Sequence, residues 1–175
     1  MLCIENTYFV MYNTYKSMLK RGGAIERKSC ALIAGSRAAG LLEKGEKSTA
    51  CLRFKMALAV QLAQLIDAGT CHFFSCMQPG AEQWAAAMVL EFARSRPDIS
   101  LTVMATPELE RSLPARVERQ AEILHKKSRR ACLAWMAMNA DRVLVLAGGG
   151  EEERRELPVW LQPKTVCLEV AEFGL

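Results

Sequence analysis

The stretch at residues 142–150 reads RVLVLAGGG, an apolar run that ends on three glycines. An apolar run without alternating polar residues is typical of a strand that is covered on both faces, as in a parallel sheet between helices. Four further segments have a similar apolar character and are predicted to be strands: Cys30–Ala34, Cys71–Ser75, Ser100–Ala105 and Thr165–Val170. The sequence therefore predicts a mostly parallel sheet.

Helical patterns alternate with these strands. One helix is expected to begin with Ser48 or Thr49 as its N-cap and to end at Gly69. The apolar residues of this helix recur at steps of three and four, namely Leu52, Met56, Val60, Ala63 and Ile66. The polar segment Leu41–Lys47 is expected to be a loop. Further helices are expected at Ala81–Arg96, within Pro107–Lys127 and at Arg130–Asn139, where Trp135, Met136 and Met138 are expected to fill the core.

The order of these elements predicts the fold class. Strands that alternate with amphipathic helices form right-handed βαβ crossovers, which place helices on both faces of a parallel sheet. We therefore predict an α/β fold with a doubly wound, mostly parallel, Rossmann-like sheet.

Length and composition fit one globular domain with an appendage. The chain has 175 residues, of which 51% are hydrophobic and 24% charged, which excludes disordered, collagen and coiled-coil proteins. Residues 1–27 hold all three tyrosines and end near Arg21-Gly22-Gly23, so we expect an N-terminal extension and linker before a domain at 28–175. No apolar run approaches the roughly 18 residues that cross a bilayer. We therefore expect a cytoplasmic protein without a membrane partner.

Neither the cysteine spacing nor the distribution of charge indicates a metal site or a nucleic-acid partner. The seven cysteines form no C-x-x-C pair, and Cys71, His72 and Cys76 match no common zinc spacing. We expect reduced thiols and no bound metal. The net charge is +4, and the one dense cationic cluster, Lys126–Arg130, has no interleaved aromatic residues. We therefore expect no nucleic-acid binding at physiological salt.

Loops at the carboxyl ends of the strands are the predicted ligand site, because open parallel sheets bind ligands at that edge. Four loops qualify: Gly35-Ser36-Arg37, Ser75–Glu82, Ala105–Glu108 and Gly148–Gly150. Glycine lets backbone amides approach a phosphate, and a helix that begins behind Gly80 adds its positive end. The alternative is that the glycines only form tight turns, since neither G-x-G-x-x-G nor a P-loop motif is present.

The segment His72–Glu91, which reads HFFSCMQPGAEQWAAAMVLE, resembles the signature of the YpsA-like family. That family belongs to the SLOG superfamily of Rossmann-like proteins, together with DprA and the LOG-type nucleotide hydrolases. In the family pattern a strand ends in S-G-M-A-x-G-x-D and leads into a helix that opens W-A-A-E. The resemblance extends over about residues 29–150, and Ala34-Gly35-Ser36-Arg37 stands in place of a family T-G-H-R.

Several positions of the family site differ in this sequence. Ser36 replaces a histidine, Cys76 a glycine and Glu82 an aspartate, while Gln78-Pro79 and Ala87 also depart from the pattern. A strand-containing segment that precedes the last family helix is expected to be missing after Lys127. The resemblance therefore implies a retained fold with an altered site.

The resemblance implies a nucleotide or a nucleotide-derived ligand, such as an ADP-ribose-like molecule. The residues that we expect to form this site are Gly35, Ser36, Arg37, Ser75, Cys76, Gly80, Glu82, Gly148, Gly149 and Gly150.

Three functions remain open at this point. The first is a non-catalytic binder of such a ligand. The second is a LOG-type hydrolase of N-glycosidic or phosphate bonds, for which Glu82 is the candidate acid–base residue because it is the only acid of the second loop. The third is a regulatory interaction module with a vestigial pocket, in which Tyr8, Tyr12 and Tyr15 contact a partner or a second copy of the chain.

Overall fold

A computed structural model of the chain describes residues 28–35, 38–43, 45–148 and 165–169. The expected extension at residues 1–27 lies outside this part of the chain. The described strands form one six-stranded sheet of order β4-β3-β2-β1-β5-β6, in which every pair is parallel. Their bounds are Lys28–Ala34 (β1), Thr70–Ser75 (β2), Ser100–Ala105 (β3), Glu122–His125 (β4), Arg142–Gly148 (β5) and Thr165–Glu169 (β6).

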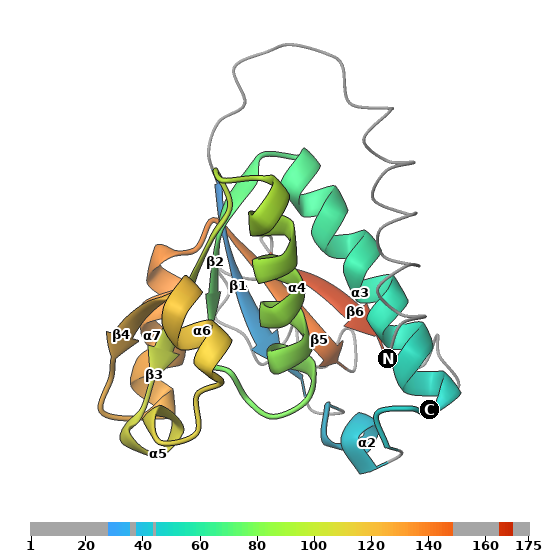
Figure 1. Cartoon of the computed structure of the whole chain (residues 1–175), viewed down its shortest axis with the longest axis horizontal. Coiled ribbons are helices and arrows are strands. Elements are labelled where there is room, and N and C mark those ends of the chain that lie inside the picture. The colour runs from blue at the N-terminus through green and yellow to red at the C-terminus, as the bar shows by residue number, and fades with distance from the viewer. Residues whose placement is uncertain (1–27, 36–37, 44, 149–164, 170–175) are drawn as a thin grey trace.

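This strand order is that of a doubly wound sheet, and the predicted fold class is confirmed. The chain starts in the middle at β1, builds β2, β3 and β4 outward on one side, and then returns to place β5 and β6 on the other side (Figure 1). The crossovers therefore diverge between β1 and β5. Five of the six strands agree with the expected positions to within two residues at each end.

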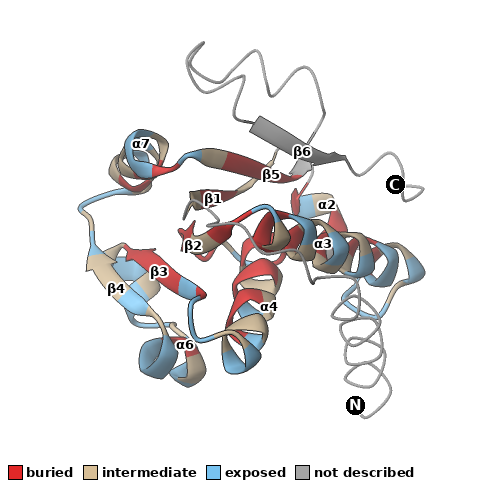
Figure 2. Ribbon diagram, turned by 90° about the horizontal axis from the view of Figure 1, so that it is seen from above, coloured by how far each residue is buried: buried red, intermediate tan, exposed pale blue. Residues whose placement is uncertain are grey.

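Six described helices connect the strands. Their bounds are Ala38–Glu43 (α2), Thr49–Asp67 (α3), Ala81–Ser95 (α4), Pro107–Glu110 (α5), Ala115–Gln120 (α6) and Arg129–Asn139 (α7). The α3 helix begins where expected, because the Ser48 hydroxyl caps it by accepting the Cys51 amide at 3.2 Å. Figure 2 shows α2, α3 and α4 on one face of the sheet and α7 on the other.

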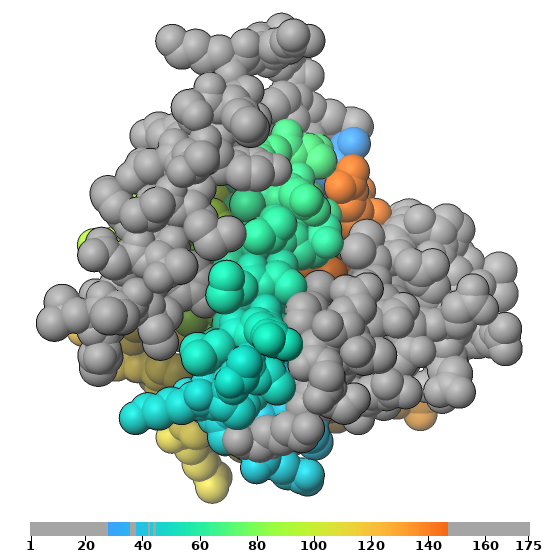
Figure 3. Space-filling view, turned by 90° about the vertical axis from the view of Figure 1, so that its right-hand side faces the viewer, coloured from blue at the N-terminus to red at the C-terminus, as the bar shows by residue number. Residues whose placement is uncertain are grey.

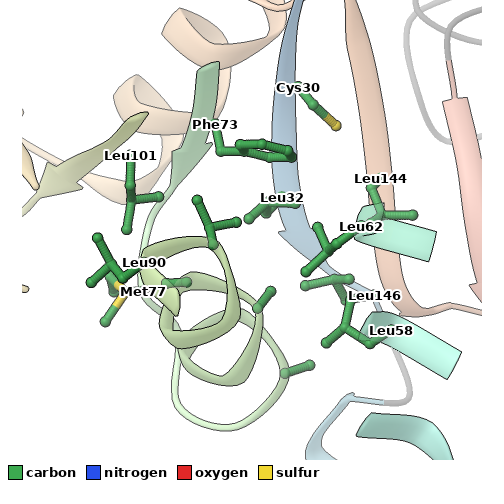
Figure 4. Close-up of a cluster of buried hydrophobic side chains, with 14 of the residues drawn as sticks. Cys30, Leu32, Leu58, Leu62, Phe73, Met77, Leu90, Leu101, Leu144 and Leu146 are labelled. Atoms are coloured by element: carbon green, nitrogen blue, oxygen red, sulfur yellow. The ribbon is translucent and has the colours of Figure 1, made fainter. Parts of the chain in front are cut away.

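Alternating side chains of β1 to β5 fill two separate cores. On the first face Leu32 of β1 and Phe73 of β2 pack with α3 and α4, as Figure 4 shows. On the second face Ala31 and Phe74 pack with Cys132 and other residues of α7. Because both faces are covered, the strands had to be apolar throughout, which is the pattern that predicted them.

The α3 helix lies along the face shown in Figure 3. The side of α3 that is buried differs from the row of apolar residues that the sequence pattern indicated. Leu52, Met56 and Val60 are 37%, 46% and 37% exposed, whereas the residues facing the core are Cys51, Phe54, Leu58, Leu62, Leu65 and Ile66. Of the described helices only α3 is long and apolar enough to cross a membrane by length and composition alone. The buried side explains much of that apolar content, because it forms the core under the sheet.

Three expectations about the elements were wrong. Glu122–His125 forms strand β4 rather than helix, because Ile123 and Leu124 pack on opposite faces at the sheet edge while pairing with β3. The expected loop at Leu41–Lys47 begins inside α2, because Leu41 is fully buried. Met138 does not fill the core, since it is 76% exposed.

The first core can be tested at Phe73, which is fully buried at the centre of the sheet. We expect Phe73→Ala to lower the free energy of unfolding by about 3–5 kcal/mol, since it removes the buried ring and leaves a cavity. Equilibrium denaturation in urea measures this loss. Met138→Ala is the control and should change stability by less than about 0.5 kcal/mol. Equal effects of the two substitutions would contradict the described packing.

Candidate functional site

The carboxyl ends of β1, β2 and β5 lie next to one another at one edge of the sheet, here called the rim. The Gly35 amide donates to the Leu146 carbonyl at 2.7 Å, which joins the end of β1 to the strand that leads into Gly148. On the other side Leu32 of β1 pairs with Ser75, the last residue of β2. The rim therefore brings together the residues at which three of the four nominated loops begin, Gly35, Ser75 and Gly148, while Ala105 ends β3 one strand further out.

A buried carboxylate lies at the centre of the rim. Glu82, in the first turn of α4, is fully buried. Its Oε1 accepts the Ala34 amide at 2.8 Å, and its Oε2 accepts the Gln78 amide at 3.0 Å and the more distant Ser75 hydroxyl at 3.4 Å. Glu82 thus links the end of β1, the end of β2 and the loop between β2 and α4.

Burial dominates the electrostatics of this carboxyl group. Removal from water raises the pKa of Glu82 above its ordinary value. The two amide hydrogen bonds, the positive charge of Arg129 and the Ser75 hydroxyl oppose that shift without cancelling it. Protonation of Glu82 is therefore easier in the folded protein than in an exposed glutamate.

The loop that carries Gln78 has an unusual backbone. Met77 has φ of 55°, and Gly80 has φ of 88°. A left-handed residue other than glycine costs about 1–3 kcal/mol and is held only where its surroundings fix it. At Met77 the amide donates to the Ser75 hydroxyl at 3.0 Å and the side chain is buried. This conformation turns the Gln78 amide toward Glu82.

Cys76 forms part of the wall beneath the rim. It is buried on the second face of the sheet, in the cluster that contains Met104 and Cys132. Burial, and after it the negative charge of Glu82, raises the pKa of the Cys76 thiol well above its ordinary range. The thiol is therefore protonated at neutral pH and acts as a small apolar group.

The structure brings together Gly35, Ser75 and Glu82 of the predicted site residues, with Gly148 at the adjoining strand end. Gly80 is the residue before α4, where it places the helix start at the rim. The remaining predicted residues, Ser36, Arg37, Gly149 and Gly150, lie outside the described part of the chain. Within that part no group of three or more metal-ligating side chains occurs.

Two donors of the site were missed because they belong to the backbone. The amides of Ala34 and Gln78 bind Glu82, and no residue type marks such donors in a sequence. Glu82 itself was singled out as an acid of the loop. Its side chain, however, is fully buried, and strand and loop amides bind both of its carboxylate oxygens.

The sequence matches no protein-family model and no curated protein. The function of the rim is therefore inferred from its geometry together with the resemblance of residues 72–91.

The raised pKa of Glu82 predicts how stability depends on pH. A carboxyl group whose pKa is higher in the folded state stabilises the protein fully below its unfolded value of 4.5, and this contribution is lost as pH rises through the folded pKa. Glu82→Gln does not titrate. The wild-type free energy of unfolding minus that of Glu82→Gln should therefore fall as pH rises above about 4.5.

Urea denaturation between pH 4 and pH 8 measures this difference. Met138→Ala, at the exposed position in α7, removes no titratable group and is the control, so its difference should be constant with pH. A difference for Glu82→Gln that grows with pH would contradict the assigned direction of the shift.

Proposed function

We propose that this protein is a non-catalytic binder of a nucleotide or a nucleotide-derived ligand, which it holds over the carboxyl ends of β1 and β5. The observation that carries the proposal is the divergence of the crossovers between these two strands. In open parallel sheets this divergence leaves a crevice above the strand ends, and ligands bind in it.

Two features of the rim favour an anionic group on the ligand. Gly35 follows β1 and Gly148 ends the neighbouring β5, and neither residue has the Cβ that would keep a phosphate from the backbone. The 15-residue helix α4 begins at the same edge, and no side chain caps its first turn. The positive end of its dipole therefore faces the rim.

The contacts of Glu82 favour binding over hydrolysis. A general acid or base must reach the bond that reacts, whereas this carboxylate is fully buried and hydrogen bonded to Ala34 and Gln78. Glu82 also occupies two amides that could otherwise bind phosphate. We propose that the phosphate instead contacts the outer glycine turns and the guanidinium of Arg37.

The resemblance of residues 72–91 to the YpsA-like family supports the same ligand class. We propose that the chain is a divergent member of that SLOG family and that the ligand is nucleotide-like, for example ADP-ribose-like. A cytoplasmic location is part of this proposal. It is supported by the free thiols of Cys30, Cys51, Cys71, Cys76 and Cys132.

A thermal-shift screen of nucleotides, NAD and ADP-ribose tests the proposal. At a free ligand concentration of 100 times Kd, binding should add about 2.7 kcal/mol to the free energy of unfolding. Arg37→Ala should weaken the stabilisation by the ligand that binds, because it removes the proposed phosphate contact. Arg94→Ala, on the exposed surface of α4, is the matched control and should bind as the wild type does.

Two results would count against the proposal. One is the absence of a shift with every compound at millimolar concentration. The other is a shift that Arg37→Ala and Arg94→Ala reduce equally, because general attraction of an anion to a cationic protein would then explain it.

A further inference from the structure

A second polar network lies on the α7 face of β2, β3 and β4, near the amino ends of β2 and β3 and away from the rim. His72 Nδ1 lies 2.5 Å from the Ser100 hydroxyl, and His72 Nε2 lies 3.0 Å from the Thr102 hydroxyl. Thr102 in turn donates to Glu122 Oε2 at 2.8 Å. The four side chains thus form one hydrogen-bonded chain. It runs across β2, β3 and β4, which Figure 2 shows as neighbouring strands.

Counting donors fixes the direction of this chain. A carboxylate only accepts, so Glu122 takes the single hydroxyl hydrogen of Thr102. The Thr102 oxygen must then accept from His72, which places the imidazole proton on Nε2. In the neutral imidazole Nδ1 is then unprotonated, and it accepts a hydrogen bond from the Ser100 hydroxyl. The network thus directs a basic nitrogen at a serine hydroxyl.

The surroundings of His72 keep the imidazole neutral. The ring is half-buried and its edge meets Phe74, with 4.8 Å between the ring centroids. Burial lowers the pKa of His72, and the negative charge of Glu122 opposes that shift only in part. A neutral imidazole can take a proton, as general base catalysis requires.

Ser100 is open to reagents from solvent. It is the first residue of β3 and is exposed, whereas Thr102, two residues along the same strand, is fully buried. A second contact of the Ser100 hydroxyl, with the Cys71 carbonyl, is longer at 3.4 Å. The arrangement of an exposed hydroxyl, a base and a buried orienting group is the one that activates nucleophilic serines.

We propose that Ser100 is a nucleophile that His72 activates and that it accepts an acyl group from activated carboxylic esters. The Ser100 oxygen attacks the ester carbonyl while its proton passes to His72 Nδ1. The new ester bond to Ser100 forms, the bond to the leaving oxygen breaks, and the leaving group departs as an alkoxide or phenoxide with the bonding electron pair. His72 then returns the proton to the leaving group or to water.

Thr102 and Glu122 are positioning residues in this proposal. The Thr102 oxygen accepts a hydrogen bond from the Nε2–H group of His72 and thereby holds Nδ1 toward Ser100. Glu122 fixes the orientation of the Thr102 hydroxyl and stabilises the imidazolium that forms when His72 takes the proton. Neither residue contacts the ester.

Acetylation of the full-length protein by p-nitrophenyl acetate tests the proposal. Peptide mass spectrometry at successive times measures the rate at which each serine gains one acetyl group. We expect Ser100 to react first, and we expect His72→Gln to slow its acetylation about 100-fold or more. Ser112 is the matched control, because it is exposed and its hydroxyl binds only a carbonyl, that of Leu109.

A second pair of variants separates activation from structure. Thr102→Val keeps the shape of the side chain but removes the hydroxyl and should slow the reaction, whereas Thr102→Ser keeps the hydroxyl and should restore it. Thermal melting confirms that each variant is folded. Acetylation of Ser100 no faster than that of Ser112, or equal rates in Thr102→Val and Thr102→Ser, would overturn the proposal.

Discussion

The hydrogen bonds from the amides of Ala34 and Gln78 to the carboxylate of Glu82 hold the rim of the sheet together. The end of β1 and the turn after β2 are separated by more than 40 residues of sequence, and this one side chain joins them. Its full burial strengthens the link, because no water competes for the two amides. The left-handed conformation of Met77 contributes to the same link, since it turns Gln78 toward the carboxylate.

The parallel sheet separates the molecule into regions with different chemistry. At the carboxyl ends of β1 and β5, glycines and the start of α4 favour an anionic ligand. Nearer the amino ends of β2 and β3, on the sheet face that α7 covers, His72 and Ser100 form the proposed pair of base and nucleophile. Because the two regions share no side chain, the binding function and the proposed reactivity of Ser100 can be tested independently.

The sequence predicted the fold class and most elements, because strands covered on both faces must be apolar and because Ser48 and Gly69 mark the helix between them. It failed at β4, where the apolar residues are only Ile123 and Leu124 and pairing with β3 decides the structure. Glu82 was found from its place in the loop, but its role was not, since backbone amides as partners leave no mark in a sequence. The same holds for the chain from Ser100 to Glu122, which forms only when three strands align.

Amide hydrogen exchange of Ala34 and Gln78, followed by NMR in the wild-type protein, tests the role of Glu82 most directly. Both amides donate to the buried carboxylate, so both should exchange as slowly as amides of the central strands, and far more slowly than the exposed loop amide of Gly45. If Ala34 and Gln78 exchange as fast as Gly45, the carboxylate does not hold the rim, and the site described here does not exist in solution.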